Sequence, residues 1–199
     1  MEWERLDLPG ARVELARGWL PPGAAERLLG ELLEGLPWEV HRIRLFGREV
    51  DSPRLSCWIG DPHAVYRYSG SRFVPRPWTA SLEALRGRLQ HELGRPFNSV
   101  LANLYRDGRD TMGWHSDDEL ELGPEPLIAS LSLGAVRRFV LRRRDDPGRK
   151  LALGLEPGSL LLMGGTTQRY WKHALPRTAR PVGPRINLTF RQIAPRPGT

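Results

Sequence analysis

The sequence is poor in the features that mark secreted and membrane proteins. Its 199 residues include a single cysteine, Cys57, so no disulfide can form within the chain and we expect a reducing, cytoplasmic setting. No apolar run approaches the length needed to cross a bilayer, and the N-terminal segment MEWERLDLPG lacks the profile of a signal peptide. Internal repeats, low-complexity tracts and long linkers are also missing. We therefore predict a single domain over residues 1–199.

Lysine is scarce as well, since it occurs only at positions 150 and 172, whereas arginine is abundant. The formal net charge is nevertheless +7. A basic chain without a long basic amphipathic helix favours nucleic acid over a membrane as its polyanionic partner. A GC-rich genome could produce the same arginine excess, so the charge alone favours nucleic acid only weakly.

Two segments of the N-terminal half have the leucine spacing of helices with one buried face. Residues 21–36 begin at prolines, and residues 77–94 end at Gly94, as helices commonly do. Between them lie short extended pieces interrupted by glycine and proline.

From about residue 97 to residue 193 the pattern changes to short strands separated by turn residues, such as EPGS at 156–159. No helical pattern separates these strands, so a parallel sheet with crossover helices is not expected. We predict an α+β fold, in which a double-sheet jelly roll over about 97–193 is backed by helices within about 1–96.

The segment RINLTFRQI at 185–193 alternates strictly, so its apolar residues face one side of a strand. The opposite face carries side chains suited to holding an anion: Arg185, Asn187, Thr189 and Arg191. The segment LANLYRDG adds Asn103 and Tyr105, which also lie two residues apart and can hydrogen-bond an anion. A solvent-facing edge strand would not need this set of side chains.

Further polar residues can bind a metal. His115 and Asp117 share one face if WHSDDE is extended, and His173 lies in the predicted strand QRYWKHALP of the same core. Together they would form a 2-His-1-carboxylate triad with open positions on iron(II). His173 alone is more simply a buried core histidine, but the polar pairs nearby favour the metal site. We expect the strand 185–193 beside His173 in the sheet, where an arginine fork would bind the distal carboxylate of 2-oxoglutarate.

The motifs N-x-Y at 103–105, H-x-D at 115–117, His173 and R-x-N-x-T-x-R at 185–191 together resemble the AlkB family of iron(II)- and 2-oxoglutarate-dependent dioxygenases. The resemblance runs from about residue 38 to residue 193. It implies a double-stranded β-helix, or jelly roll, with N-terminal helices and a nucleotide-recognition lid.

The resemblance also implies roles for the site residues. The triad would be the catalytic iron site, and Arg185 would bind the distal carboxylate of 2-oxoglutarate. The cosubstrate pocket as a whole would be formed by Asn103, Tyr105, Arg185, Asn187, Thr189 and Arg191.

Five further residues match substrate-binding positions of the family. Glu119 matches an acid that faces the exocyclic amine of a damaged base, although it could be a solvated loop residue. Tyr66 and Tyr68 match lid residues that stack on a flipped base, although they could pack in the core. Phe46 matches a wedge that fills the gap in a duplex, or else lies inside the fold. Arg54 matches an arginine that contacts a phosphate or the gap.

The activity that the resemblance implies is direct reversal of DNA alkylation damage. Methyl groups of 1-methyladenine and 3-methylcytosine in DNA would be oxidised with release of formaldehyde, succinate and CO₂. A wider substrate range would include RNA. Three alternatives are an AlkB-like dioxygenase acting on tRNA or protein, a non-catalytic nucleic-acid-binding module and a zinc hydrolase. The intact ligands disfavour the binding module, and the anion-holding pairs disfavour the hydrolase. We expect a monomer without a membrane partner.

Overall fold

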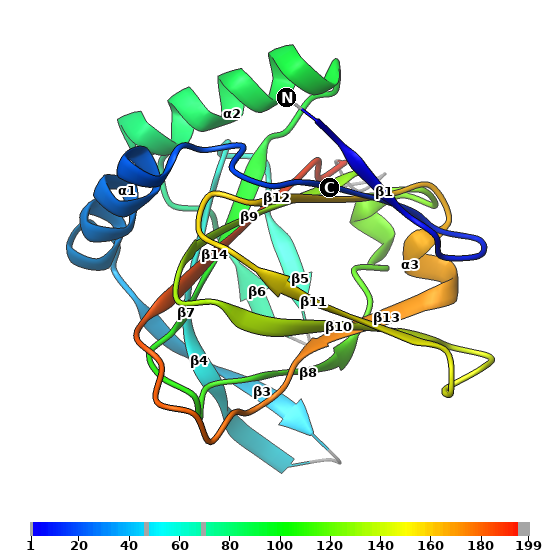
Figure 1. The fold of residues 1–199 in the computed structure, drawn as a ribbon. Coiled ribbons are helices and arrows are strands. Elements are labelled where there is room, and N and C mark those ends of the chain that lie inside the picture. The colour runs from blue at the N-terminus through cyan, green and yellow to red at the C-terminus, as the bar shows by residue number, and fades with distance from the viewer. Residues whose placement is uncertain (1, 46–47, 69–70, 195–199) are drawn as a thin grey trace.

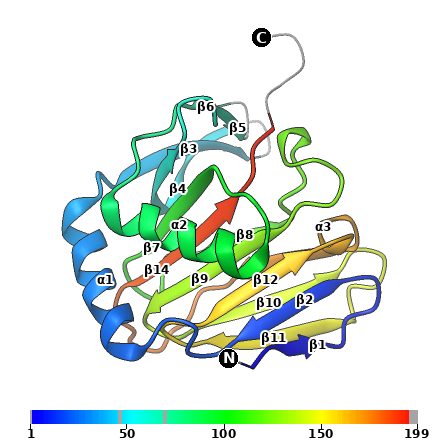
Figure 2. The same ribbon diagram turned by 90° about the horizontal axis from the view of Figure 1, so that it is seen from above.

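A computed structural model of the protein describes residues 2–45, 48–68 and 71–194. Two antiparallel sheets face each other, and two long helices cover the outer face of the larger sheet (Figure 1, Figure 2). This arrangement confirms the predicted α+β fold with a jelly-roll core. Within the described ranges, no helix is long and apolar enough to span a membrane.

The larger sheet has eight strands, in the spatial order β1 (Glu4–Leu6), β2 (Arg12–Ala16), β12 (Leu160–Gly164), β9 (Ile128–Gly134), β14 (Arg185–Arg191), β7 (Ser99–Tyr105), β4 (Arg48–Gly60) and β3 (Glu39–Leu45). The smaller sheet has the order β11 (Lys150–Leu155), β10 (Arg137–Arg143), β13 (Trp171–Leu175) and β8 (Met112–His115). A separate hairpin consists of β5 (Tyr66–Tyr68) and β6 (Ser71–Phe73). The helices are α1 (Pro22–Gly35), α2 (Ala80–Leu93), the short α3 (Thr167–Tyr170) and the 3-10 helix η1 (Leu120–Leu122).

The two long helices lie within the predicted ranges, and local sequence explains their ends. The Thr79 side chain accepts a hydrogen bond from the backbone N–H of Leu82 at the start of α2. Gly94 closes that helix in the left-handed conformation, with a φ of 61°. Pro22 occupies the first turn of α1, where its missing N–H leaves no intrahelical bond unmade.

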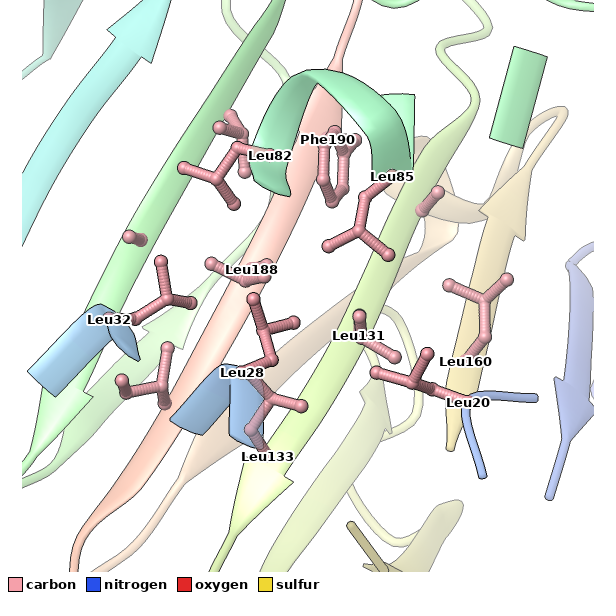
Figure 3. Packing of buried hydrophobic residues seen from close by; sticks show 14 of the residues in the cluster. Leu20, Leu28, Leu32, Leu82, Leu85, Leu131, Leu133, Leu160, Leu188 and Phe190 are labelled. Atoms are coloured by element: carbon pink, nitrogen blue, oxygen red, sulfur yellow. The ribbon is translucent and has the colours of Figure 1, made fainter. Parts of the chain in front are cut away.

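Leucines of both helices pack on the outer face of the larger sheet (Figure 3). Leu28 of α1 and Leu82 of α2 share one buried cluster with alternate residues of β14. In that strand Ile186, Leu188 and Phe190 are fully buried. Burying each such side chain stabilises the fold by about 1.5–3 kcal/mol. Because the apolar face of β14 points toward the helices, its polar face must point between the two sheets.

A second apolar cluster lies on the other side of the larger sheet. It includes Leu15 and Ile128 from that sheet and Leu141 and Trp171 from the smaller one. This apolar cluster packs the two sheets against each other. The interior next to the polar face of β14 has a different lining.

The N-terminal part contributes more to the larger sheet than the sequence indicated. We predicted helices and a lid before about residue 97, but β1, β2, β3 and β4 all pair within that sheet. The segment RVELA at 12–16 alternates over too few residues to be distinguished from a loop. Its pairing with β12 decides its structure. The predicted strand QRYWKHALP also begins with the helical turn α3, so its strand starts only at Trp171.

Gly158, in the turn between β11 and β12, provides a test of the packing. Its φ is +78°, and a Cβ there would lie 2.0 Å from the carbonyl oxygen of Leu20. We expect Gly158→Ala to lower the free energy of unfolding by roughly 2–4 kcal/mol, because it adds backbone strain and a clash. The matched change Gly30→Ala, on the exposed face of α1, should raise it by about 0.5–1 kcal/mol. Urea denaturation measures both, and a Gly158→Ala protein as stable as the parent would contradict this packing.

Candidate active site

Three metal-binding side chains converge at one end of the smaller sheet. His115 ends β8, Asp117 follows two residues later, and His173 lies on β13; their ligand atoms all lie within 4.8 Å of one another. His115 pairs directly with His173 across the two neighbouring strands, and the ring centroids are 4.1 Å apart. Within the part of the chain that the structure describes, this is the one such group of histidine, cysteine and acidic side chains.

Both imidazoles are prepared to bind a metal. His115 Nδ1 donates to the carbonyl of Gly113 at 2.8 Å, which leaves Nε2 for a metal. Burial lowers the pKa of His115, and burial together with the nearby His115 lowers the pKa of His173 to about 3. Both rings are therefore neutral at pH 7 and need not lose a proton before coordination.

Two hydrogen bonds fix Asp117, one to its side chain and one from its backbone. Its Oδ1 accepts a hydrogen bond from Nη2 of Arg191 at 2.8 Å, and its backbone N–H donates to Oε1 of Gln168 at 3.0 Å. Burial opposes ionisation, but Arg191 and the two histidines hold the pKa of Asp117 below its ordinary value. A carboxylate with two neutral imidazoles is a donor set that iron(II) accepts.

A cavity extends from the triad between the two sheets. The predicted anion-holding residues lie on its wall: Asn103, Tyr105, Arg185, Asn187, Thr189 and Arg191. Strands β7 and β14 are neighbours, with Tyr105 opposite Arg185 and Asn103 opposite Asn187. Cross-strand partners share a face, so this register brings the two polar patterns together.

Arg185 is a buried cation of this cavity, with only 2% of its surface exposed. One Nη donates to Ser132 Oγ at 2.9 Å, while its Nε has no hydrogen-bond partner among the described residues. Burial lowers the pKa of Arg185 to about 10, which still leaves it charged at neutral pH. A buried cation is stable only with a compensating anion, so the cavity fits a carboxylate brought by a ligand.

The structure corrects the expected position of β14. We expected the strand 185–193 beside His173 in one sheet, but β14 lies between β9 and β7 in the larger sheet and His173 lies in the smaller one. The proline-rich connection 176–184 carries the chain from one sheet to the other. Arg191 therefore reaches Asp117 directly across the interior, whereas Arg185 and the triad line the cavity between the sheets.

Sequence reasoning missed the residues that position this polar face. Ser132 accepts a hydrogen bond from Arg185, and Ser130 accepts one from Nδ2 of Asn187 at 2.8 Å. Gln168, which binds the backbone of Asp117, was also missed. The segment ASLSLG contained the signal for the serines, since its two hydroxyls alternate with apolar residues along one strand.

A second cavity meets the first at the triad. The two cavities share Leu101, Met112, His115, Asp117 and Arg191. The rest of the second wall consists of His41, Ser52, Arg54, Ser56, Trp58 and Phe73. The metal-binding side chains thus face an anion-holding space on one side and a space with aromatic walls on the other.

Arg54 belongs to the wall of this second cavity and is only 6% exposed. Its Nε donates to Oδ1 of Asn103 at 2.7 Å and its Nη1 donates to Ser52 Oγ at 2.9 Å. The predicted contact of Arg54 with a phosphate or with the gap in a duplex stays a prediction. Arg54 is a candidate substrate-binding residue through the cavity that it lines.

The other predicted substrate-binding residues either do not line the two cavities or have side chains that the structure does not describe. Glu119 is half-buried just before η1, and it is not among the residues that line the two cavities. The backbone of Tyr66 and Tyr68 forms β5, but their side chains lie outside the described part of the structure. Phe46 lies outside the described residues altogether.

Two facing antiparallel sheets with a 2-His-1-carboxylate triad and a buried arginine define an iron(II)- and 2-oxoglutarate-dependent oxygenase. The family model of the 2OG-Fe(II) oxygenase superfamily matches residues 12–191. Together with its sequence relatives, this match shows that the chain belongs to the AlkB family within that superfamily. It is accordingly a dioxygenase that uses iron(II) and 2-oxoglutarate.

The relatives cover most of the chain. Alpha-ketoglutarate-dependent dioxygenase alkB homolog 3 of Homo sapiens is 37% identical over 94% of this chain and 68% of that protein. DNA oxidative demethylase ALKBH2 of Mus musculus is 39% identical over 86% of this chain and 76% of that protein. A solved structure titled "The structure of OsALKBH1" aligns with a TM-score of 0.64 and 18% identity, covering 96% of this chain and 100% of that one. At that identity the structural match supports the fold alone.

The neutral histidines lead to a prediction about metal binding. Two imidazoles of ordinary pKa would together release roughly half a proton at pH 7 on binding a metal. We expect a clearly smaller release for this site, because the pKa values of both imidazoles and of the carboxyl group are lowered toward the coordinating protonation state. Calorimetric titration with Mn(II) in buffers of different ionisation enthalpy measures this number. A release of half a proton or more would contradict the pKa directions given above.

Arg185 leads to a prediction about the cosubstrate. Leaving the distal carboxylate unpaired costs about 3–5 kcal/mol, so Arg185→Ala should weaken 2-oxoglutarate binding by more than about a hundredfold. Arg185→Lys keeps the charge but loses the planar fork, and its affinity should fall between those of Arg185→Ala and the parent. Calorimetry of the Mn(II)-loaded proteins tests this, with Arg138→Ala on the exposed face of β10 as the control. A Kd for Arg185→Ala within threefold of the parent value would exclude the assigned role.

Proposed function

We propose that the protein is an oxidative demethylase of alkylated nucleobases, acting on 1-methyladenine and 3-methylcytosine in DNA. The observation that carries this proposal is the position of the triad between two different cavities. One is lined for a dicarboxylate and contains the buried Arg185, and the other has Trp58 and Phe73 in its wall. A reaction that oxidises a methyl group on a flat ring beside an anionic cosubstrate needs both spaces.

The residues of the chain divide the work. His115, Asp117 and His173 would hold iron(II), which with 2-oxoglutarate and O₂ supplies the oxidant for an unactivated C–H bond. Arg185 binds the distal carboxylate of the cosubstrate and so sets its orientation. The methyl group gains one oxygen atom from O₂ while 2-oxoglutarate is converted to succinate and CO₂. The hydroxymethyl group then leaves as formaldehyde, and the ring nitrogen of the base is restored.

The second cavity supports a nucleobase as the substrate. A base must leave its stack to reach a buried metal, and aromatic walls retain it by stacking worth about 1–3 kcal/mol. The net charge of +7 supports a polyanionic partner. On the outer face of the smaller sheet, Arg142 stacks over the half-exposed Trp114, with its Cζ atom 4.2 Å from the ring centroid. This combination suits a nucleic-acid chain. RNA belongs to the same proposal as a wider substrate range.

The setting that fits this activity is a reducing, cytoplasmic compartment, with the protein as a monomer. Cys57 is buried, and burial raises the pKa of its thiol to about 11. Such a thiol is protonated at neutral pH and does not react readily, so the fold does not depend on its oxidation.

The experiment is a product assay with a short oligonucleotide that carries 1-methyladenine. With iron(II), 2-oxoglutarate and ascorbate, the parent should release formaldehyde and succinate in equal amounts, and His173→Ala should release neither. Succinate without formaldehyde would overturn the base as substrate and direct the search to tRNA and protein substrates. Bound iron without any succinate would contradict the cosubstrate assignment itself.

A further inference from the structure

His41 occupies an irregular position in the larger sheet. Strands β3 and β4 pair with Val40 opposite Leu55, but the next pair is Arg42 opposite Asp51, so His41 faces three residues of β4. Pro53 lies among those three, as expected for a proline that cannot donate to a regular ladder. Bulges of this kind often redirect side chains beside active sites. Here His41 and residues of the bulged segment line the second cavity.

The imidazole of His41 packs against another ring, but one of its nitrogens lacks a hydrogen-bond partner among the described residues. Phe73 meets it edge to face, with ring centroids 4.7 Å apart and an angle of 83° between the planes. Its Nε2 is buried and has no hydrogen-bond partner among the described residues. Such a buried nitrogen carries a desolvation penalty, so its partner is expected to be a ligand or water.

The contacts of His41 define what that partner must offer. Burial lowers the pKa of His41, an effect opposed by Glu39 and by the backbone of Ser56 and reinforced by Arg54. The ring is therefore neutral, with one nitrogen as donor and the other as acceptor. The backbone of Ser56 raises the pKa of the ring, as an acceptor beside a ring N–H does, so we place the proton on Nδ1 and assign the acceptor role to the unpartnered Nε2. The partner must donate a hydrogen bond.

We propose that Nε2 of His41 accepts a hydrogen bond from the exocyclic amino group of the alkylated base and makes His41 a specificity-determining residue. This inference rests on the demethylase function proposed above. Adenine and cytosine carry an amino group next to the ring nitrogen that is methylated, whereas uracil and thymine carry only carbonyls beside that nitrogen. A carbonyl oxygen facing Nε2 would place two acceptors together. His41 thus favours aminated over carbonyl-bearing bases.

The test compares 3-methylcytosine with 3-methyluracil in one oligonucleotide sequence, because the first base carries an amino group at the position where the second carries a carbonyl. His41→Phe keeps a flat ring but loses the acceptor. It should lower kcat/KM for 3-methylcytosine by about tenfold and leave 3-methyluracil unchanged, as expected for one lost hydrogen bond. His41→Gln, which retains an acceptor, should recover part of the selectivity. His91→Phe, on the exposed face of α2, is the matched control and should keep the parent ratio.

Fluorescence anisotropy with the same two oligonucleotides, without iron, separates the failure of this inference from the failure of the proposed function. An equal loss on both bases, or no loss on either, in an active and folded His41→Phe protein would overturn the role of His41 alone. If the parent binds 3-methylcytosine but does not demethylate it, the proposed function fails and the binding ratio of parent to His41→Phe decides the inference. A parent that demethylates and binds both bases equally overturns the role of His41 alone, whereas a parent that demethylates neither base overturns the proposed function.

Discussion

The buried ion pair between Arg191 and Asp117 is the contact on which the site depends. It joins β14 of the larger sheet to the segment after β8 of the smaller sheet, with N and O 2.8 Å apart and both side chains at most 5% exposed. Removing either partner would leave an uncompensated buried charge, which costs about 3–5 kcal/mol. Asp117 therefore has two functions: it balances a buried arginine and it belongs to the metal-binding triad.

A second constraint follows from the alternation of β14. Its apolar face packs under the two long helices, so the polar face is forced into an interior that is otherwise close-packed with aliphatic side chains. Ser130 and Ser132 satisfy part of this polar face by accepting hydrogen bonds from Asn187 and Arg185. The charge of Arg185 remains, and we expect a dicarboxylate in the cavity beside it to balance that charge. On this proposal, binding of the cosubstrate and stability of the fold are coupled.

The sequence was informative wherever the chemistry is local. The alternation of RINLTFRQI predicted which side chains share a face, and the two-residue spacing of His115 and Asp117 predicted that both reach one metal. Gly94 ends α2, as the sequence predicted. These features depend on a few neighbouring residues, which a single sequence contains.

The features that sequence reasoning missed depend on pairing between distant strands. Alternation gives the faces of a strand but not its neighbours, so β14 was placed in the wrong sheet relative to His173. The irregular pairing at His41 and the burial of Arg54 arise from the register of β3 and β4, which has no local signature. The serines of β9 looked like ordinary strand residues until their partners on β14 were known.

The most direct measurement is a crystal structure of the protein with Mn(II) and 2-oxoglutarate. We predict the metal on His115, Asp117 and His173, with the distal carboxylate of 2-oxoglutarate in a paired contact with the guanidinium of Arg185. We also expect the cosubstrate to occupy the cavity between the sheets and to leave the cavity beside His41 free. A cosubstrate bound beside His41, or a distal carboxylate turned away from Arg185, would contradict the central claim that the polar face of β14 is the wall of the cosubstrate pocket.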